Sequence, residues 1–157
     1  MHFEIVPSGS FSLKESAAFL GGWPPAGERG TRWSGHLHLA FVPEGELDAA
    51  GVCLQQRDDS VVGEVFGETV AIEAVRAQAA QILSLDVDGA GFAAVGHRDA
   101  VVAGLQARYP GFRPVNFLSP YEAAVWALIS QRTRMTQASA LKRRMACELG
   151  AGARVQR

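Results

Sequence analysis

The chain has 157 residues, of which 48% are hydrophobic, and its formal net charge is −1. This length fits one domain, or one domain with part of a second, and the apolar content is sufficient for a buried core. No run of about 18 consecutive apolar residues occurs, which argues against a membrane-spanning helix.

The first part of the chain contains short apolar runs separated by turn residues. These runs predict strands at residues 3–6, 36–41, 52–56 and 61–66. The last two strands are joined across Asp58 and Asp59, and residues 43–46 form another turn. Because tight turns connect antiparallel neighbours, we predict an antiparallel sheet.

Helix start signals occur among these strands and after them. The predicted N-caps are Ser12, Thr69 and Asp99. A long helix that follows a run of strands is expected to lie across one face of the sheet. We therefore predict an α+β domain over residues 1–111, with its helices on one face. The proline and glycine residues within 110–114 mark the end of this domain.

Residues 112–150 have the pattern of a loop, a helix, a turn and a second helix. Ser119, Pro120 and Glu122 form a helix start, because serine caps the first turn, proline fits the first position and Glu122 completes a capping box. The first helix is expected to bury Tyr121, Ala124, Val125, Leu128 and Ile129. The second is expected to bury Ala138, Leu141, Met145 and Leu149. Gly150 then ends the second helix in a left-handed conformation.

A family resemblance rests on this stretch. The pattern Arg-Pro, Ser-Pro-Tyr-Glu-Ala, Trp-Ala-Leu-Ile-Ser-Gln-Arg and a final Leu-Gly across residues 113–150 resembles the opening helices of the helix-hairpin-helix DNA glycosylases. It is most similar to the DNA-3-methyladenine glycosylase II family, and the order of segments upstream resembles that family's N-terminal α+β domain. The resemblance implies that residues 112–157 begin an all-α glycosylase domain.

The resemblance also implies an activity. Such glycosylases hydrolyse the bond between a damaged base and its deoxyribose in base excision repair, after the base has left the stack of double-stranded DNA. The resemblance therefore implies a protein that acts on alkylated bases of the 3-methyladenine type, with damaged duplex DNA as partner and with no cofactor.

The helix junction supplies the residues expected to contact DNA. In the family, the side chain that fills the gap left by the flipped base follows a Gln at this junction. Gln131 matches that Gln, which places Arg132 at the gap-filling position and Arg134 beside it. The family often has an apolar residue or Gln where this chain has Arg132, but a guanidinium plane can also stack and contact phosphate. The alternative is that both arginines are ordinary surface residues of a turn.

Two parts of the family's catalytic domain have no counterpart in the sequence. The helix-hairpin-helix that grips phosphate and the aspartate that stabilises the cationic sugar both lie further toward the C-terminus in the family. No Asp follows Asp99 here, so we assign no catalytic residue. The chain looks like a truncated glycosylase that covers the N-terminal domain and the first two helices, and we expect it to be inactive alone.

The basic residues are unevenly distributed. Residues 113–157 contain eight Lys and Arg against two Glu, whereas the rest of the chain has seven basic and fourteen acidic residues. A basic helical end fits phosphate binding. The alternative is a solvated helix face with ordinary charged residues.

Smaller motifs carry less information. His36 and His38 share a strand face, but no Cys or carboxylate at ligand spacing joins them, so we predict no metal site. The acidic residues at 86–89 lack the third position and the terminal Glu of a calcium loop. Trp126 is expected in the core rather than as a base-stacking platform, because an aromatic residue on a helix normally packs.

Two other hypotheses remain open for the function. One is a DNA-binding remnant without catalysis, which would bind duplex DNA in a salt-dependent way. The other is an α+β module that holds a small ligand or a partner. Apolar residues on two helices without further partners also predict self-association. Cys53 and Cys147 are far apart in the sequence, and the N-terminal residues do not resemble a secretory signal. Both observations fit the reducing cytoplasm.

Overall fold

The computed structural model of the chain describes residues 1–26, 33–67 and 69–150. The strands are β1 (His2–Ile5), β2 (His36–Phe41), β3 (Ala50–Arg57) and β4 (Ser60–Phe66). The helices are α1 (Leu13–Gly22), the 3-10 turn η1 (Pro24–Ala26), α2 (Ile72–Ile82), α3 (Ala93–Gly96), α4 (Ala100–Arg108), α5 (Pro120–Ile129) and α6 (Met135–Leu149). None of these described helices has both the length and the apolar composition needed to cross a bilayer.

The strands form one sheet in the order β1-β4-β3-β2. Every neighbouring pair is antiparallel, which confirms the predicted pairing. The register places Phe3 of β1 opposite Gly63 of β4, and a side chain at Gly63 would meet the Phe3 ring. Glycine at this position therefore leaves the space that the ring occupies.

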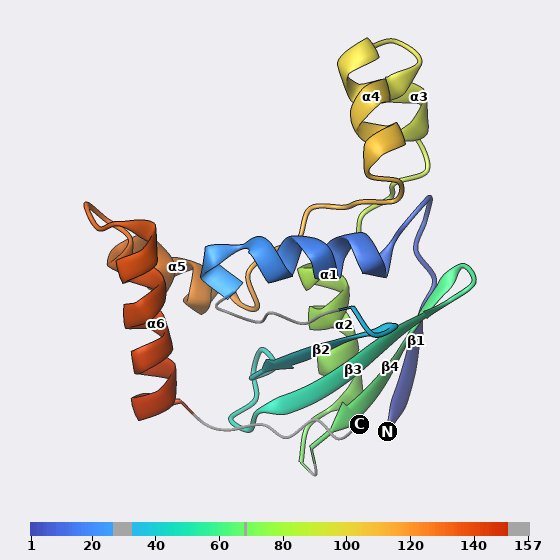
Figure 1. Cartoon of the computed structure of the whole chain (residues 1–157). Helices are drawn as coiled ribbons and strands as arrows, with labels where there is room; N and C mark the ends of the chain where they lie inside the picture. Colours follow the sequence, from blue (N-terminus) through green and yellow to red (C-terminus); the bar gives the residue numbers. More distant parts are fainter. Residues whose placement is uncertain (27–32, 68, 151–157) are drawn as a thin grey trace.

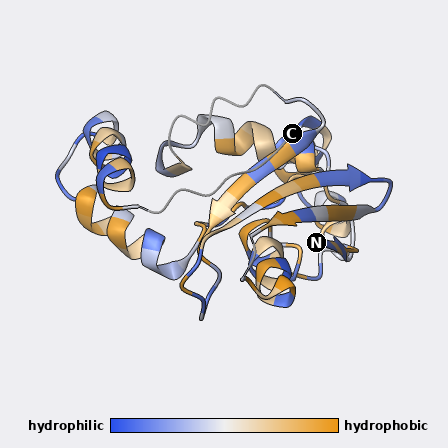
Figure 2. Ribbon diagram, turned by 90° about the horizontal axis from the view of Figure 1, so that it is seen from below, coloured by the Kyte–Doolittle hydropathy of each residue, from blue (hydrophilic) through white to orange (hydrophobic). Residues whose placement is uncertain are grey.

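One face of the sheet carries the core, and both α1 and α2 pack on it (Figure 1). Side chains alternate along the strands, so every second residue of β1 and β2 is buried. The buried strand residues include Phe3, Ile5, Leu37, Leu39, Phe41, Val52, Leu54, Val61 and Val65. Figure 2 shows apolar residues along the strands and a hydrophilic stretch where β3 ends. The α+β fold with helices on one face of the sheet is confirmed.

The two helices that cover the sheet begin differently. Ser12 caps α1 as predicted, since its hydroxyl accepts a hydrogen bond from the Glu15 N–H at 3.3 Å. The predicted cap of α2 is wrong, because this helix begins two residues later, and the Thr69 hydroxyl donates to the Asp48 carboxylate instead. Val70 is 5% exposed and belongs to the core, so the chain enters the core before α2 begins.

Helices α3 and α4 form a hairpin that stands off from the sheet and its two covering helices (Figure 1). Asp99 caps α4 as predicted, and its carboxylate accepts from the N–H groups of Val101 at 2.8 Å and Val102 at 3.0 Å. No residue of α4 is buried, and Leu105 is 53% exposed. The apolar side chains of this hairpin therefore do not join the core.

Arg113 begins the linker to α5, and it is 7% exposed. Its guanidinium donates hydrogen bonds to the carbonyls of Ser8 and Ser10, which follow β1. It also donates to the carbonyls of Ser84 and Val87, which follow α2, at 2.9 Å each. A guanidinium presents five N–H donors in a rigid plane, so one side chain joins these two segments to the linker.

The loop around this guanidinium carries further polar contacts. Asp88 accepts hydrogen bonds from the Ser8 hydroxyl and from the Ala90 N–H. These two bonds, with a smaller effect of Arg113, hold the pKa of the Asp88 carboxyl below its usual range. A side chain at Gly89 would meet the Arg113 guanidinium, so the loop approaches it closely.

The linker then follows the end of α2. The Ser84 hydroxyl donates to the Pro114 carbonyl at 2.8 Å. The Asn116 N–H donates to the Ile82 carbonyl at 2.8 Å, and its side-chain amide donates to the Gln81 carbonyl at 2.8 Å. The linker is therefore bound to the sheet-and-helix unit, which consists of the sheet with α1 and α2, before α5 begins. This contact fixes the position at which α5 starts.

Replacing Arg113 by Met should lower the free energy of unfolding by about 3 kcal/mol or more, because buried carbonyls lose a charged donor. In a chain of this size, that change lowers the melting temperature by roughly 6 to 12 °C. The control Arg144→Met removes an exposed guanidinium and should change the stability by no more than about 0.5 kcal/mol. Equal melting temperatures of the two variants in scanning calorimetry would contradict the role given to Arg113.

Candidate nucleic-acid interface

Helix α5 begins with a capping arrangement close to the predicted one. The Ser119 hydroxyl accepts from the Glu122 N–H at 3.1 Å, and Pro120 occupies the first turn. The Glu122 carboxylate accepts from the Leu118 N–H at 2.8 Å, one residue before the position that a capping box uses. This carboxylate therefore fixes the entry of the chain into α5.

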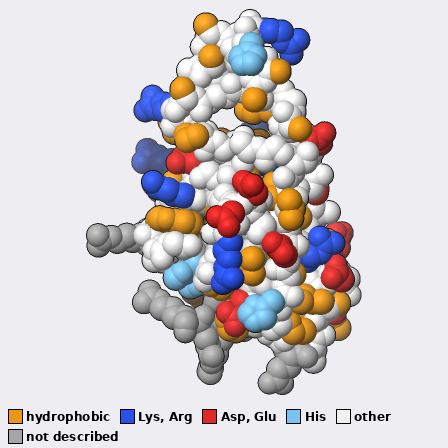
Figure 3. Space-filling view, turned by 90° about the vertical axis from the view of Figure 1, so that its right-hand side faces the viewer, with side chains coloured by type: hydrophobic (Ala, Val, Ile, Leu, Met, Phe, Trp, Pro, Cys, Tyr) orange, Lys and Arg blue, Asp and Glu red, His pale blue; other side chains and the backbone are white. Residues whose placement is uncertain are grey.

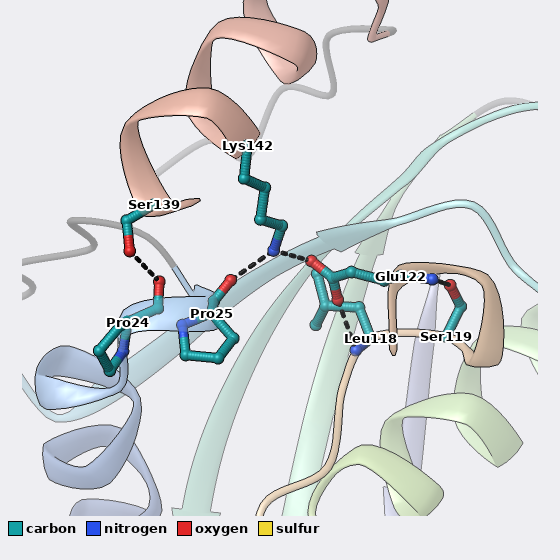
Figure 4. A network of polar contacts seen from close by, with 7 residues as sticks. All are labelled: Pro24, Pro25, Leu118, Ser119, Glu122, Ser139 and Lys142. Atoms are coloured by element: carbon teal, nitrogen blue, oxygen red, sulfur yellow. Dashed lines mark hydrogen bonds and ion pairs between the residues drawn. The ribbon is translucent and has the colours of Figure 1, made fainter. Parts of the chain in front are cut away.

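Lys142 of α6 connects that helix start to η1 (Figure 4). Its ammonium group forms an ion pair with Glu122 and donates to the Pro25 carbonyl. On the same helix, the Ser139 hydroxyl donates to the Pro24 carbonyl at 3.2 Å. The side chains of Lys142 and Glu122 are each 18% exposed, so salt screens this pair less than a surface pair. Helix α6 is thus held against both α5 and η1.

The sequence did not reveal this role of Lys142. It appears there as one of three consecutive basic residues, and its carboxylate partner lies 20 positions away. Helical spacing identifies pairs three or four residues apart, so no local pattern joins Glu122 to Lys142.

The junction between α5 and α6 is a tight polar turn. Arg132 has a φ of 52°, in the left-handed region that residues other than glycine rarely adopt. The Thr133 N–H donates to the Ser130 carbonyl at 3.4 Å, and the Thr133 hydroxyl donates to the Gln131 carbonyl at 3.0 Å. These contacts hold the backbone of the turn and place Arg132 within it.

The structure brings the three predicted DNA-contacting residues together on this turn. Gln131, Arg132 and Arg134 are all exposed. Over the described parts of the chain, their side chains make no hydrogen bond or ion pair. Two guanidinium groups are therefore available at the junction. Their contact with DNA stays a prediction.

The start of α6 adds to the positive character of the turn. Arg134 is the N-cap residue, and its own side chain does not cap the first turn of this helix. The N-terminus of a helix carries a partial positive charge, and its free N–H groups can bind phosphate oxygens. The backbone and the arginine side chains thus favour the same kind of ligand.

The positive surface is smaller than the sequence suggests. Arg113 is buried and Lys142 is paired, so neither belongs to an open basic surface. Arg154 and Arg157 lie outside the described residues. The exposed basic residues of the junction and α6 are Arg132, Arg134, Arg143 and Arg144.

The face of the molecule away from α6 has a different character. In the view of Figure 3, Asp and Glu side chains gather over the middle of this face, with some Lys and Arg side chains beside them. The result agrees with the excess of acidic residues before residue 113. A phosphate backbone is therefore attracted more strongly to the α5–α6 end than to this face.

The buried face predicted for α5 is wrong. Tyr121 is 77% exposed and Leu128 is 70% exposed, whereas Trp126 is 8% exposed. Helix α5 carries apolar residues around much of its circumference, so periodicity does not decide which side packs. The indole of Trp126 packs inward instead, and Trp126 is buried as predicted.

The prediction for α6 is also wrong in part. Ala138 is buried, but Leu141 is 42% exposed and Leu149 is 80% exposed. Gly150 has a φ of −82°, so it does not end the helix in a left-handed conformation. A side chain at Gly150 would instead meet the Ala146 carbonyl, which explains why glycine fits there.

The open face of the sheet holds the two histidines. His36 and His38 lie side by side, with ring centroids 4.8 Å apart. In the described residues, no group of three or more His, Cys, Asp or Glu side chains is placed to hold a metal ion. Cys53 is paired with His38 in the sheet, and burial, with a smaller effect of Glu64, raises the pKa of its thiol. A raised pKa disfavours the reactive thiolate.

A solved structure shares this fold. It is described as a 3-methyladenine DNA-glycosylase from Archaeoglobus fulgidus, and it matches with a TM-score of 0.71 and 21% sequence identity. The match covers 93% of this chain and 50% of that chain, so this chain spans about half the length of the glycosylase. No protein-family model and no curated protein matches the sequence. The comparison therefore shows a glycosylase-like fold over nearly the whole chain.

Replacing Arg132 by Glu should weaken binding to duplex DNA several-fold at low salt. The slope of the logarithm of the binding constant against the logarithm of salt concentration should fall by about 1, because one phosphate contact is lost. Fluorescence anisotropy of a labelled duplex at several salt concentrations measures both quantities.

Arg57→Glu is the matched control for this experiment. Arg57 is exposed at the end of β3, across the sheet from α6 (Figure 1). The substitution makes the same change in net charge and should leave the salt slope as it is. An equal loss in both variants, or no loss in Arg132→Glu, would contradict an interface at the junction.

Proposed function

We propose that this chain is the DNA-contacting part of a DNA N-glycosylase that removes alkylated bases from double-stranded DNA in base excision repair. The observation that supports this most strongly is the junction turn, where Arg132 and Arg134 are exposed and have no hydrogen bond or ion pair with the described residues, on a glycosylase-like fold. The sequence resemblance over residues 113–150 supports the same function.

Each residue of the turn has a role in this proposal. Arg134 and the first turn of α6 bind phosphate oxygens. Arg132 enters the gap left by the flipped base, where its guanidinium plane stacks on the neighbouring bases and also contacts a phosphate. Gln131 offers an amide to a base edge.

The proposal also assigns the two parts of the chain. Residues 1–111 are the N-terminal α+β domain, and residues 112–157 begin the helical helix-hairpin-helix domain. Arg113 and Lys142 connect the two parts through backbone carbonyls. The junction turn is thereby presented to DNA at a fixed place relative to the sheet.

Cleavage of the bond to an alkylated purine builds positive charge on the sugar, and a nearby carboxylate stabilises this charge. Both carboxylates of the helical part are already engaged. Glu122 accepts from the Leu118 N–H and pairs with Lys142, and Glu148 lies 3.2 Å from Arg144. We propose that the catalytic carboxylate comes from polypeptide that corresponds to the other half of the glycosylase, which this chain does not cover.

Residues 1–157 alone should therefore release no measurable 3-methyladenine from alkylated duplex DNA. The reason is that removal of a preorganised charged group commonly costs on the order of a hundredfold or more in rate. Chromatography of released bases measures the activity, with the Archaeoglobus fulgidus enzyme as positive control. Release by this chain that disappeared in Glu122→Gln would make Glu122 the catalytic carboxylate and contradict the proposal.

We also propose that the exposed helical face promotes self-association. Tyr121, Leu128 and Leu149 are large apolar side chains with most of their surface in solvent. Sedimentation velocity over a range of concentrations should show species larger than a monomer, and Leu128→Gln should shift them toward the monomer.

The control for this measurement is Val101→Gln on the α3–α4 hairpin, where the side chain is 73% exposed. This variant should sediment like the parent chain. A single monomeric species at every concentration would argue against self-association.

A further inference from the structure

A groove lies between the end of α1 and α6. Residues 21–24 form one wall, and one face of α6 forms the other. The groove has a volume of about 300 Å³, and its α6 wall includes Met135, Thr136 and Arg143. Because Met135 directly follows Arg134, the groove begins where the junction turn ends.

Hydrogen bonds fix the two walls to each other. Ser139 donates to the Pro24 carbonyl at 3.2 Å, and Lys142 donates to the Pro25 carbonyl (Figure 4). Both donors come from α6 and both acceptors come from η1. The groove is therefore preformed, and a ligand that enters it does not have to order the walls.

Trp23 supplies the aromatic surface of the groove. Its ring centroid lies 4.7 Å from that of Phe117 and 5.5 Å from that of Phe19, and Phe19 in turn lies 5.6 Å from Phe112. These contacts hold the indole in place, and it remains partly exposed. An indole held in this way is a suitable platform for a flat ligand.

We propose that this groove binds one nucleotide of a DNA strand, with the base against Trp23 and the phosphate near Arg143. A nucleotide combines a flat base, which stacks on aromatic rings, with an anionic phosphate, which binds guanidinium groups. The Thr136 hydroxyl adds a hydrogen-bonding group to the same wall.

The inference rests on the proposed function, because the strand reaches the groove from the Arg132–Arg134 turn. The exposed arginines at this end attract the phosphate backbone, and the groove then takes a nucleotide next to the contacted phosphates. Trp23 belongs to the sheet-and-helix unit, so this unit also contacts DNA.

Tryptophan fluorescence tests the inference in the full chain. The Trp33→Phe background removes one of the three tryptophans, and Trp126 is 8% exposed and inaccessible to an oligomer. A short single-stranded thymine oligomer should quench Trp23, because a base stacks on the indole. An abasic oligomer of equal length carries the same phosphates and should leave the fluorescence unchanged. Equal quenching by the two oligomers overturns the inference.

A groove-filling variant gives an independent test. Ala140 is exposed and lines the groove, so Ala140→Phe occupies the space without removing a hydrogen bond. The affinity for the thymine oligomer should fall about fivefold or more, as expected when one stacked base is lost. Ala146→Phe is the control, because Ala146 is exposed on the same helix and is not part of the groove. Unchanged affinity in Ala140→Phe, or an equal loss in both variants, overturns the inference.

The outcomes separate this inference from the proposed function. If duplex binding depends on Arg132 but no base-dependent quenching of Trp23 occurs, the groove does not bind a nucleotide and the proposed function still stands. Absence of any binding to duplex or single-stranded DNA overturns both.

Discussion

The buried guanidinium of Arg113 determines how the sheet and the helical end of this molecule meet. A buried cation is costly unless its donors are satisfied, and here four backbone carbonyls satisfy them. Two of these carbonyls follow β1 and two follow α2, so one guanidinium connects the segment after β1 to the segment after α2. The linker that carries Arg113 is thereby held at the end of α2, and the start of α5 has a defined position.

The Glu122–Lys142 pair extends this order to α6. Glu122 belongs to the start of α5 and Lys142 to α6, and the same ammonium group reaches the Pro25 carbonyl of η1. The contacts of Arg113 and the Glu122–Lys142 pair thus both hold α5 and α6 in place. The basic turn that joins these two helices is therefore held at both of its ends. A supported turn loses less conformational entropy when it binds a ligand. In this account, the α+β part gives the proposed DNA-contacting turn its position.

The local parts of this arrangement could be predicted from the sequence. Ser12, Asp99 and Ser119 cap helices through contacts within three residues, and the tight turns between the strands indicated antiparallel pairing. The contacts of Arg113 and Lys142 could not be predicted, because they join residues 20 to 117 positions apart. The packing side of α5 was also not predictable, since its apolar residues surround the helix. Thr69 does not cap α2, because Val70 packs in the core and the helix begins only at Ile72.

Amide hydrogen exchange of the chain, free and bound to duplex DNA, tests most directly the claim that the junction turn is the DNA interface. The account predicts slower exchange in the bound state at residues 130–137, which include the turn and the uncapped start of α6. The open face of the sheet and the α3–α4 hairpin should exchange as in the free chain. Protection of the sheet face or of the hairpin, with no change at residues 130–137, would contradict the account.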